Sequence, residues 1–167
     1  RYHDAVAHFT SAIQLFPAGA PKTLYSNRAA ALTLAARELA KADEKRVALL
    51  SSAVDDADRV IAMDATWYKG HSRRGNALHV MGRLAEARTS YEEALRLDPT
   101  NSMVMSSLKD VEEGEASAAA NAAASAAAKA AAAAKAAAAA KAAAAANVAA
   151  AAMAAEDART LQSGRAP

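Results

Sequence analysis

The sequence predicts an all-α protein: a right-handed solenoid of stacked antiparallel helix pairs that ends in a capping helix and an alanine-rich extension. Three observations predict this fold class. One pattern of apolar positions recurs along the chain, its members lie three or four residues apart as on one face of a helix, and the mixed composition of residues 1–115 gives way to alanine. We therefore expect a folded array over residues 1–115 and a low-complexity tail over residues 116–167.

The recurring pattern has six positions and is clearest near the two ends of the array. The first copy is Tyr2, Ala5, Phe9, Ala12, Ile13 and Pro17, and the last copy is Leu84, Ala87, Tyr91, Ala94, Leu95 and Pro99. A weaker copy precedes the last one by 34 residues, at Leu50, Ala53, Ala57, Val60, Ile61 and Ala65. This period is that of repeats built from two helices, in which the alanines allow a neighbouring helix to approach closely and proline ends the unit.

Each copy of the pattern is expected to be the second helix of a repeat. Residues 1–17 are then the second helix of repeat one, whose first helix is missing, so its apolar face should be exposed or frayed. Repeat two spans residues 22–65 and repeat three spans residues 66–99. A capping helix is expected over residues 101–115.

First helices are expected at the start of repeats two and three. Residues 23–36 and 66–81 have the required apolar spacing, and Gly82 follows as a helix terminator. About twelve residues are inserted between the helices of repeat two, over residues 37–50. They contain no glycine or proline, a composition that allows them to extend the flanking helices. Ser52 and Asp55 have the spacing of a capping box and predict that the second helix restarts there.

The tail over residues 116–167 consists of alanine blocks separated by Lys129, Lys135 and Lys141. Alanine has the highest helix propensity, but the tail has no apolar stripe, so it is expected to be a solvent-exposed helix or disordered. It is too weakly apolar, and too often interrupted by lysine, to be identified as a membrane span. The absence of distinctive side chains favours a spacer over a binding site.

Composition and motifs disfavour several classes of function. Residues 1–115 carry 15 basic and 16 acidic side chains, so they lack the positive charge expected of a nucleic-acid-binding domain. The chain has no cysteine, which fits a cytoplasmic location. The histidine and aspartate spacings match no zinc or calcium motif, and no phosphate loop or nucleophile motif is present. We expect no enzyme activity, no metal and no cofactor.

Polar side chains on the first helices form the candidate binding site, because these helices line the concave face of a solenoid. Lys69 and Arg73 are four residues apart on one helix face, and Arg73 can bind a carboxylate through two hydrogen bonds. Asn27 occupies the place of Arg73 one repeat earlier, and Asn76 is a weaker candidate on the same helix as Arg73. The alternative interpretations are a solvated face for the two cations and, for Asn27, a hydrogen bond to backbone between helices.

Two segments carry a resemblance to a known family. Residues 24–30, LYSNRAA, followed by residues 69–73, KGHSR, resemble the dicarboxylate-clamp tetratricopeptide-repeat (TPR) cochaperones over residues 1–115. The resemblance implies a protein-interaction module that binds the acidic C-terminal Glu-Glu-Val-Asp peptide of a heat-shock chaperone. Of the five clamp positions of that family, Asn27, Lys69 and Arg73 are present, and the other two belong to the missing first helix of repeat one.

Two other binding functions remain open. The array could be a scaffold that contacts a folded partner through its convex face or through residues 37–50. Trp67 and Tyr68, which lie beside Lys69, Arg73 and Arg74 in the sequence, could instead stack on RNA bases. Packing of Trp67 between helices is the favoured interpretation, since it lies at a repeat boundary.

Overall fold

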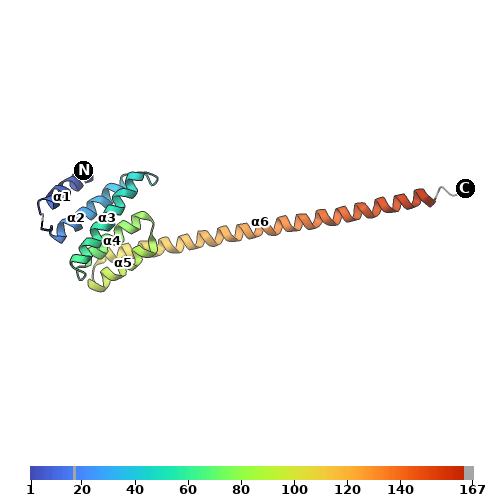
Figure 1. Cartoon of the computed structure of the whole chain (residues 1–167). Helices are drawn as coiled ribbons and strands as arrows, with labels where there is room; N and C mark the ends of the chain where they lie inside the picture. Colours follow the sequence, from blue (N-terminus) through green and yellow to red (C-terminus); the bar gives the residue numbers. More distant parts are fainter. Residues whose placement is uncertain (17, 164–167) are drawn as a thin grey trace. The chain divides into compact units, whose positions relative to one another are not determined.

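A computed structural model describes residues 1–16 and 18–163, which contain six helices and no strand (Figure 1). The chain divides into two compact units, residues 1–118 and the residues from 119 onward. The predicted all-α class is confirmed. The helices, in chain order, are α1 Tyr2–Gln14, α2 Lys22–Arg37, α3 Glu44–Met63, α4 Tyr68–Met81, α5 Leu84–Leu97 and α6 Ser102–Ser163.

Helices α1 to α5 pack in the order in which they follow one another along the chain. Each contacts the next, and α2 also contacts α4 (Figure 1). The contact between α2 and α4 places the first helices of repeats two and three side by side. This arrangement is the one expected of stacked helix pairs, and it puts the candidate polar side chains on adjoining helices.

Small residues allow α4 to lie close to both of its neighbours. Gly70 is buried against α3, where a Cβ atom would lie 2.9 Å from Ile61 Cγ1. Gly75 is buried against α5, where a Cβ atom would lie 2.7 Å from two ring atoms of Tyr91. Helix α4 therefore packs against α3 on one side and against α5 on another. Its remaining face is left for the polar residues of a site.

Helix α1 is the least buried part of the array, since none of its residues is fully buried. Leu15 and Phe16, which follow it, keep 78% and 45% of their surface exposed. The apolar residues of the repeat pattern in α1 are half-buried, so apolar surface at this end is exposed mainly after the helix. Pro17, predicted to end this repeat, lies outside the described residues.

The inserted residues of repeat two extend α3 toward the N-terminus. Asp43 caps this helix by accepting a hydrogen bond of 2.8 Å from the backbone N–H of Lys45. Arg46 donates a hydrogen bond of 2.7 Å to the carbonyl oxygen of Val80, near the end of α4. The predicted restart at Ser52 is therefore wrong: helix-compatible residues and this contact carry α3 through that position without a break.

Helix α6 combines the predicted capping helix with the alanine-rich segment. Near its start Val104 and Val111 are buried against α4 and α5 in the largest apolar cluster of the array. Residues 119–159 are all exposed and helical, the first of the two forms expected for the tail. By length and composition alone, this helix also meets the requirements of a bilayer span, with a mean hydropathy of 1.3 in its most apolar window.

Candidate functional site

Helix α4 presents Lys69, Arg73 and Asn76 on one face, because their spacings of four and three residues each correspond to about one helical turn. Their environments differ along this face. Lys69 is exposed, whereas Arg73 and Asn76 are half-buried. The face therefore changes from a solvated end near Lys69 to a recessed region near Asn76.

A cavity of about 220 Å³ lies between three helices of the array. Four of its lining residues come from α2, two from α4 and one from the start of α6. These residues are Ala30, Thr33, Leu34, Arg37, Arg73, Asn76 and Met103. The structure thus brings Arg73 and Asn76 together in one cavity and leaves Asn27 and Lys69 outside its lining.

The guanidinium group of Arg73 is poorly solvated and unpaired. Its Nε atom is buried and has no hydrogen-bond partner within the described chain. Burial lowers the pKa of Arg73 from its ordinary value, and the nearby Tyr68 opposes this shift only in part. Because a buried donor without a partner costs free energy, a carboxylate placed here would gain a strong, charge-assisted hydrogen bond.

Asn76 is held in place by a buried phenol. The hydroxyl group of Tyr91 donates a hydrogen bond of 3.0 Å to Oδ1 of Asn76. Burial raises the pKa of Tyr91 to about 12, so this phenol stays protonated and remains a donor at neutral pH. With its oxygen engaged, Asn76 has its side-chain NH₂ group left to donate to a ligand in the cavity.

Lys69 lies beside the indole of Trp67 at the N-terminal end of α4. Its ammonium is 5.6 Å from the ring centroid, and that of Lys22 is 4.9 Å from the same centroid. Trp67 also packs against an apolar cluster that contains Tyr25 and Val60. The predicted packing role of Trp67 is confirmed, and two lysine ammonium groups lie near its ring.

Asn27 is exposed on α2, and its side chain makes no hydrogen bond with another described residue. The alternative that this amide satisfies backbone groups between helices is therefore wrong. Asn27 is adjacent to Ser26 and Arg28, which point elsewhere: Ser26 is buried, and Arg28 pairs with Asp56 on α3. Its amide is thus free to meet a ligand at the exposed end of the α2 face.

Arg37 is a further residue of the site, although its sequence position predicted that it belongs to the insertion. In the structure Arg37 is the last residue of α2 and lines the cavity. Positions 27, 30, 34 and 37 follow one another at helical spacings of three and four. This periodicity continues past the predicted helix end at residue 36, and it could have identified Arg37 as a member of the same face.

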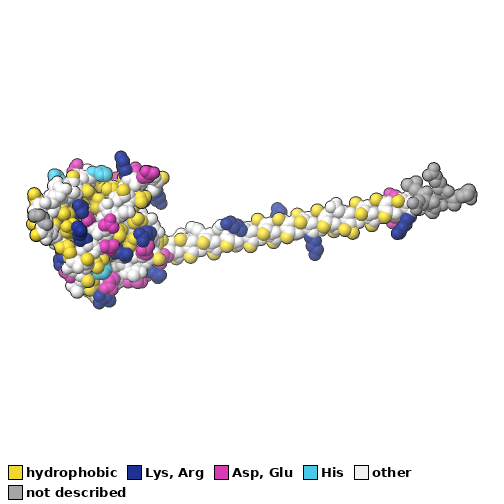
Figure 2. All heavy atoms as spheres, viewed as in Figure 1, with side chains coloured by type: hydrophobic (Ala, Val, Ile, Leu, Met, Phe, Trp, Pro, Cys, Tyr) yellow, Lys and Arg dark blue, Asp and Glu magenta, His cyan; other side chains and the backbone are white. Residues whose placement is uncertain are grey.

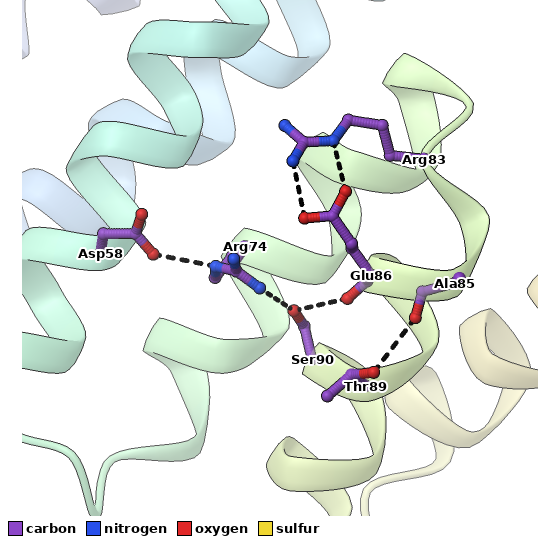
Figure 3. A network of polar contacts seen from close by, with 7 residues as sticks. All are labelled: Asp58, Arg74, Arg83, Ala85, Glu86, Thr89 and Ser90. Carbon is purple, nitrogen blue, oxygen red and sulfur yellow. Dashed lines mark hydrogen bonds and ion pairs between the residues drawn. The ribbon is translucent and has the colours of Figure 1, made fainter.

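A polar network fixes the orientation of α4 relative to its neighbours (Figure 3). Arg74 donates hydrogen bonds of 2.9 Å to Asp58 on α3 and 2.8 Å to Ser90 on α5. Ser90 in turn donates to the carbonyl oxygen of Glu86, and Arg83 pairs with the Glu86 carboxylate. Because Arg74 is adjacent to Arg73, this network holds the backbone that positions the cavity arginine.

Charges of both signs are interspersed on the face of the array drawn in Figure 2. Basic side chains there lie among acidic ones. Within the array, Arg74 pairs with Asp58 and Arg28 pairs with Asp56. This face carries no extended basic surface of the kind that binds phosphate backbones. The cavity differs locally, since two of its lining residues are arginines and none is acidic.

Comparisons with known proteins agree with the repeat architecture. Residues 68–101 match the tetratricopeptide repeat family. The chain is 35% identical over 122 residues to the Hsp70-Hsp90 organizing protein of Triticum aestivum, covering 73% of this chain and 19% of that protein. It is 38% identical over 121 residues to the heat shock protein sti1 homolog of Schizosaccharomyces pombe, covering 72% and 18%. The chain thus spans about a fifth of the length of these relatives.

A solved structure extends the comparison to the fold. The first TPR of Spaghetti (RPAP3), bound to the HSP90 peptide SRMEEVD, superposes with a TM-score of 0.55 at 26% identity. The match covers 69% of this chain and 80% of that one. The similarity therefore extends well beyond the single repeat of residues 68–101.

Proposed function

Because the chain belongs to the tetratricopeptide-repeat proteins, we propose that α2 and α4 together bind the acidic C-terminal peptide of a heat-shock chaperone. We call the proposed peptide site the groove: it consists of the cavity and the exposed side chains of Asn27 and Lys69. The chain would then act as a cochaperone or adaptor in the cytoplasm, without catalysis. The observation that carries this proposal is the recessed, unpaired guanidinium of Arg73 in a cavity without acidic residues. Such a group favours an anionic ligand over a neutral one.

Four side chains form the proposed clamp, and each binds a different part of the peptide. Lys69 and Arg73 pair with peptide carboxylates, and Asn27 donates a hydrogen bond to the terminal carboxylate. Asn76, held by Tyr91, donates from its amide NH₂ to the peptide beside Arg73. Specificity for a free C-terminus follows because an amidated end lacks the second negative charge that these donors would meet.

The comparisons support this choice of ligand. The matched solved domain is bound to an HSP90 peptide that ends in Glu-Glu-Val-Asp, and the matched relatives are named for heat-shock proteins. The three clamp residues named from the sequence lie on the two first helices that contact one another. Since the chain spans about a fifth of those relatives, the proposal concerns this array and not their other activities.

The test is an NMR titration of the labelled chain with SRMEEVD as the free acid and as the C-terminal amide. NMR is chosen because it measures weak binding as well as locating it. We expect the free acid to bind and to shift signals of α2 and α4, and the amide to bind at least tenfold more weakly. Lys69→Ala should cost about 1 kcal/mol of binding free energy, and Arg73→Ala about 2 kcal/mol because its charge is less exposed.

Lys41→Ala is the matched control, since Lys41 is exposed and does not line the cavity. It should leave the affinity for the free acid within about twofold of the wild type. Equal binding of acid and amide, or shifts confined to other helices, would refute the clamp.

A further inference from the structure

The cavity contains an arginine to which the proposed clamp assigns no role. Arg37 is exposed at the end of α2, lines the same cavity as Arg73 and Asn76, and forms no ion pair with the described residues. We propose that Arg37 determines peptide specificity by binding an acidic side chain that lies several residues before the C-terminal one. This inference rests on the proposed function, because the clamp sets the position and direction of the peptide.

The lining of the cavity supports an anionic partner for Arg37. Its seven residues include two guanidinium groups and no carboxylate, so their positive charges are not compensated locally. Leu34 and Met103 lie on the same lining and place apolar surface beside the charged groups. A carboxylate between Arg37 and Arg73 would relieve the repulsion of the two cations and bind both.

The charge of Arg37 also influences Tyr91, the phenol that holds Asn76 in place. Burial is the main influence on the pKa of Tyr91 and raises it, while the positive charge of Arg37 acts in the opposite direction. This phenol is the group that donates to Asn76. Because Arg37 lines the cavity with Arg73 and Asn76, its side chain faces the same site as theirs.

Helix geometry gives the position of the expected acidic residue. Asn27 and Arg37 are ten residues apart on α2, which corresponds to about 15 Å along the helix axis. An extended peptide advances about 3.3 Å per residue, so this distance spans four to five residues. Allowing about one residue for the long arginine side chain, Arg37 reaches the third or fourth residue before the C-terminal one.

The experiment places a single glutamate at different positions of one peptide. In SRMEEVD free acid, both glutamates are replaced by glutamine, and one glutamate is then introduced at the second, third or fourth position before the C-terminal aspartate. Affinities are measured by NMR for the wild type, Arg37→Gln and Lys41→Gln. The two variants remove the same charge four residues apart, but Lys41 does not line the cavity.

We expect the wild type to bind the peptides with glutamate at the third or fourth position about fivefold more tightly than the peptide with glutamate at the second. Arg37→Gln should abolish this preference, and Lys41→Gln should keep it. A preference that survives in Arg37→Gln, or an equally large loss in Lys41→Gln, would overturn the inference.

The free acid and the amide of SRMEEVD separate this result from a failure of the clamp. If the wild type discriminates between them but the preference does not depend on Arg37, only the role of Arg37 is refuted. If it binds both equally, the clamp is refuted and the role of Arg37 with it.

Discussion

Replacing Gly75 with alanine tests whether close packing of α4 on α5 supports the groove. The added Cβ atom would lie 2.7 Å from Cδ1 and Cε1 of Tyr91 and 3.1 Å from its Cγ, whereas carbon atoms in favourable contact are about 3.5–4.0 Å apart. The Tyr91 ring is rigid and fully buried, so it cannot turn away into solvent. One of the two helices must therefore move by roughly 1 Å.

The magnitude follows from two opposing effects. Overpacking of a core costs about 1–3 kcal/mol, and a rigid buried ring places Gly75→Ala near the upper end of that range. Alanine regains about 1 kcal/mol of helix propensity over glycine. We expect Gly75→Ala to lower the free energy of unfolding by about 2 kcal/mol.

The control is the same substitution at Gly114 in α6. There the added Cβ atom would lie 3.2 Å from Cδ1 of Leu84, the end of a flexible and only partly buried side chain that can adjust. Gly114→Ala should therefore leave stability unchanged or raise it by up to about 1 kcal/mol. Both variants gain the same helix propensity, and they differ only in the side chain that the added Cβ atom meets.

Urea unfolding followed by tryptophan fluorescence measures both variants. Trp67 is the single tryptophan of the chain and packs in the array, so it reports on the array and not on the alanine-rich helix. With a slope of about 2 kcal/mol per molar urea, Gly75→Ala should lower the midpoint by about 1 M. A midpoint equal to or above that of the wild type would refute the packing argument. Because Tyr91 orients Asn76, the same variant should also weaken peptide binding.

Three further predictions concern stability. Arg28 donates two hydrogen bonds of 2.7 Å to the carboxylate of Asp56, whose side chain is 7% exposed. Asp56→Asn should therefore lower the free energy of unfolding in urea by about 2–3 kcal/mol. An unchanged urea midpoint would contradict this prediction. Hydrogen bonding, first of all from Lys22, lowers the pKa of Asp64 to about 2, below its value in the unfolded chain. The ionised Asp64 therefore stabilises the fold above about pH 4, and this contribution is lost as the pH falls toward 2. Asp64→Asn should flatten the dependence of Tm on pH in this range. Equal slopes of Tm against pH for wild type and variant would argue against the pairing of Asp64 with Lys22. Ala138→Pro, in the exposed part of α6, should reduce the helical circular dichroism signal. The urea midpoint measured by tryptophan fluorescence should stay the same. A shifted midpoint would show that this segment stabilises the array.

Local patterns account for what could be predicted about the helices and for part of the site. Offsets of three and four residues specify a helix face wherever they occur, so the helix pairs and the shared face of Lys69 and Arg73 followed from spacing alone. The end of α2 and the start of α3 could not be placed this way. The capping-box signal at Ser52 is worth about 1 kcal/mol, and an uninterrupted helix held by the contact of Arg46 with α4 outweighs it.

The sequence by itself determined the all-α repeat architecture, the near-neutral charge of the array and the candidate residues Asn27, Lys69, Arg73 and Asn76, because periodicity and composition are local properties. Only the tertiary structure decided which of these share a cavity. The packing of α2, α4, α5 and α6 decides three features of the site. Arg73 is partly buried, Tyr91 donates a hydrogen bond to Asn76, and Arg37 lines the same cavity as both. Solvation and pairing of a side chain are set by residues distant in sequence, and no spacing rule within one helix contains that information.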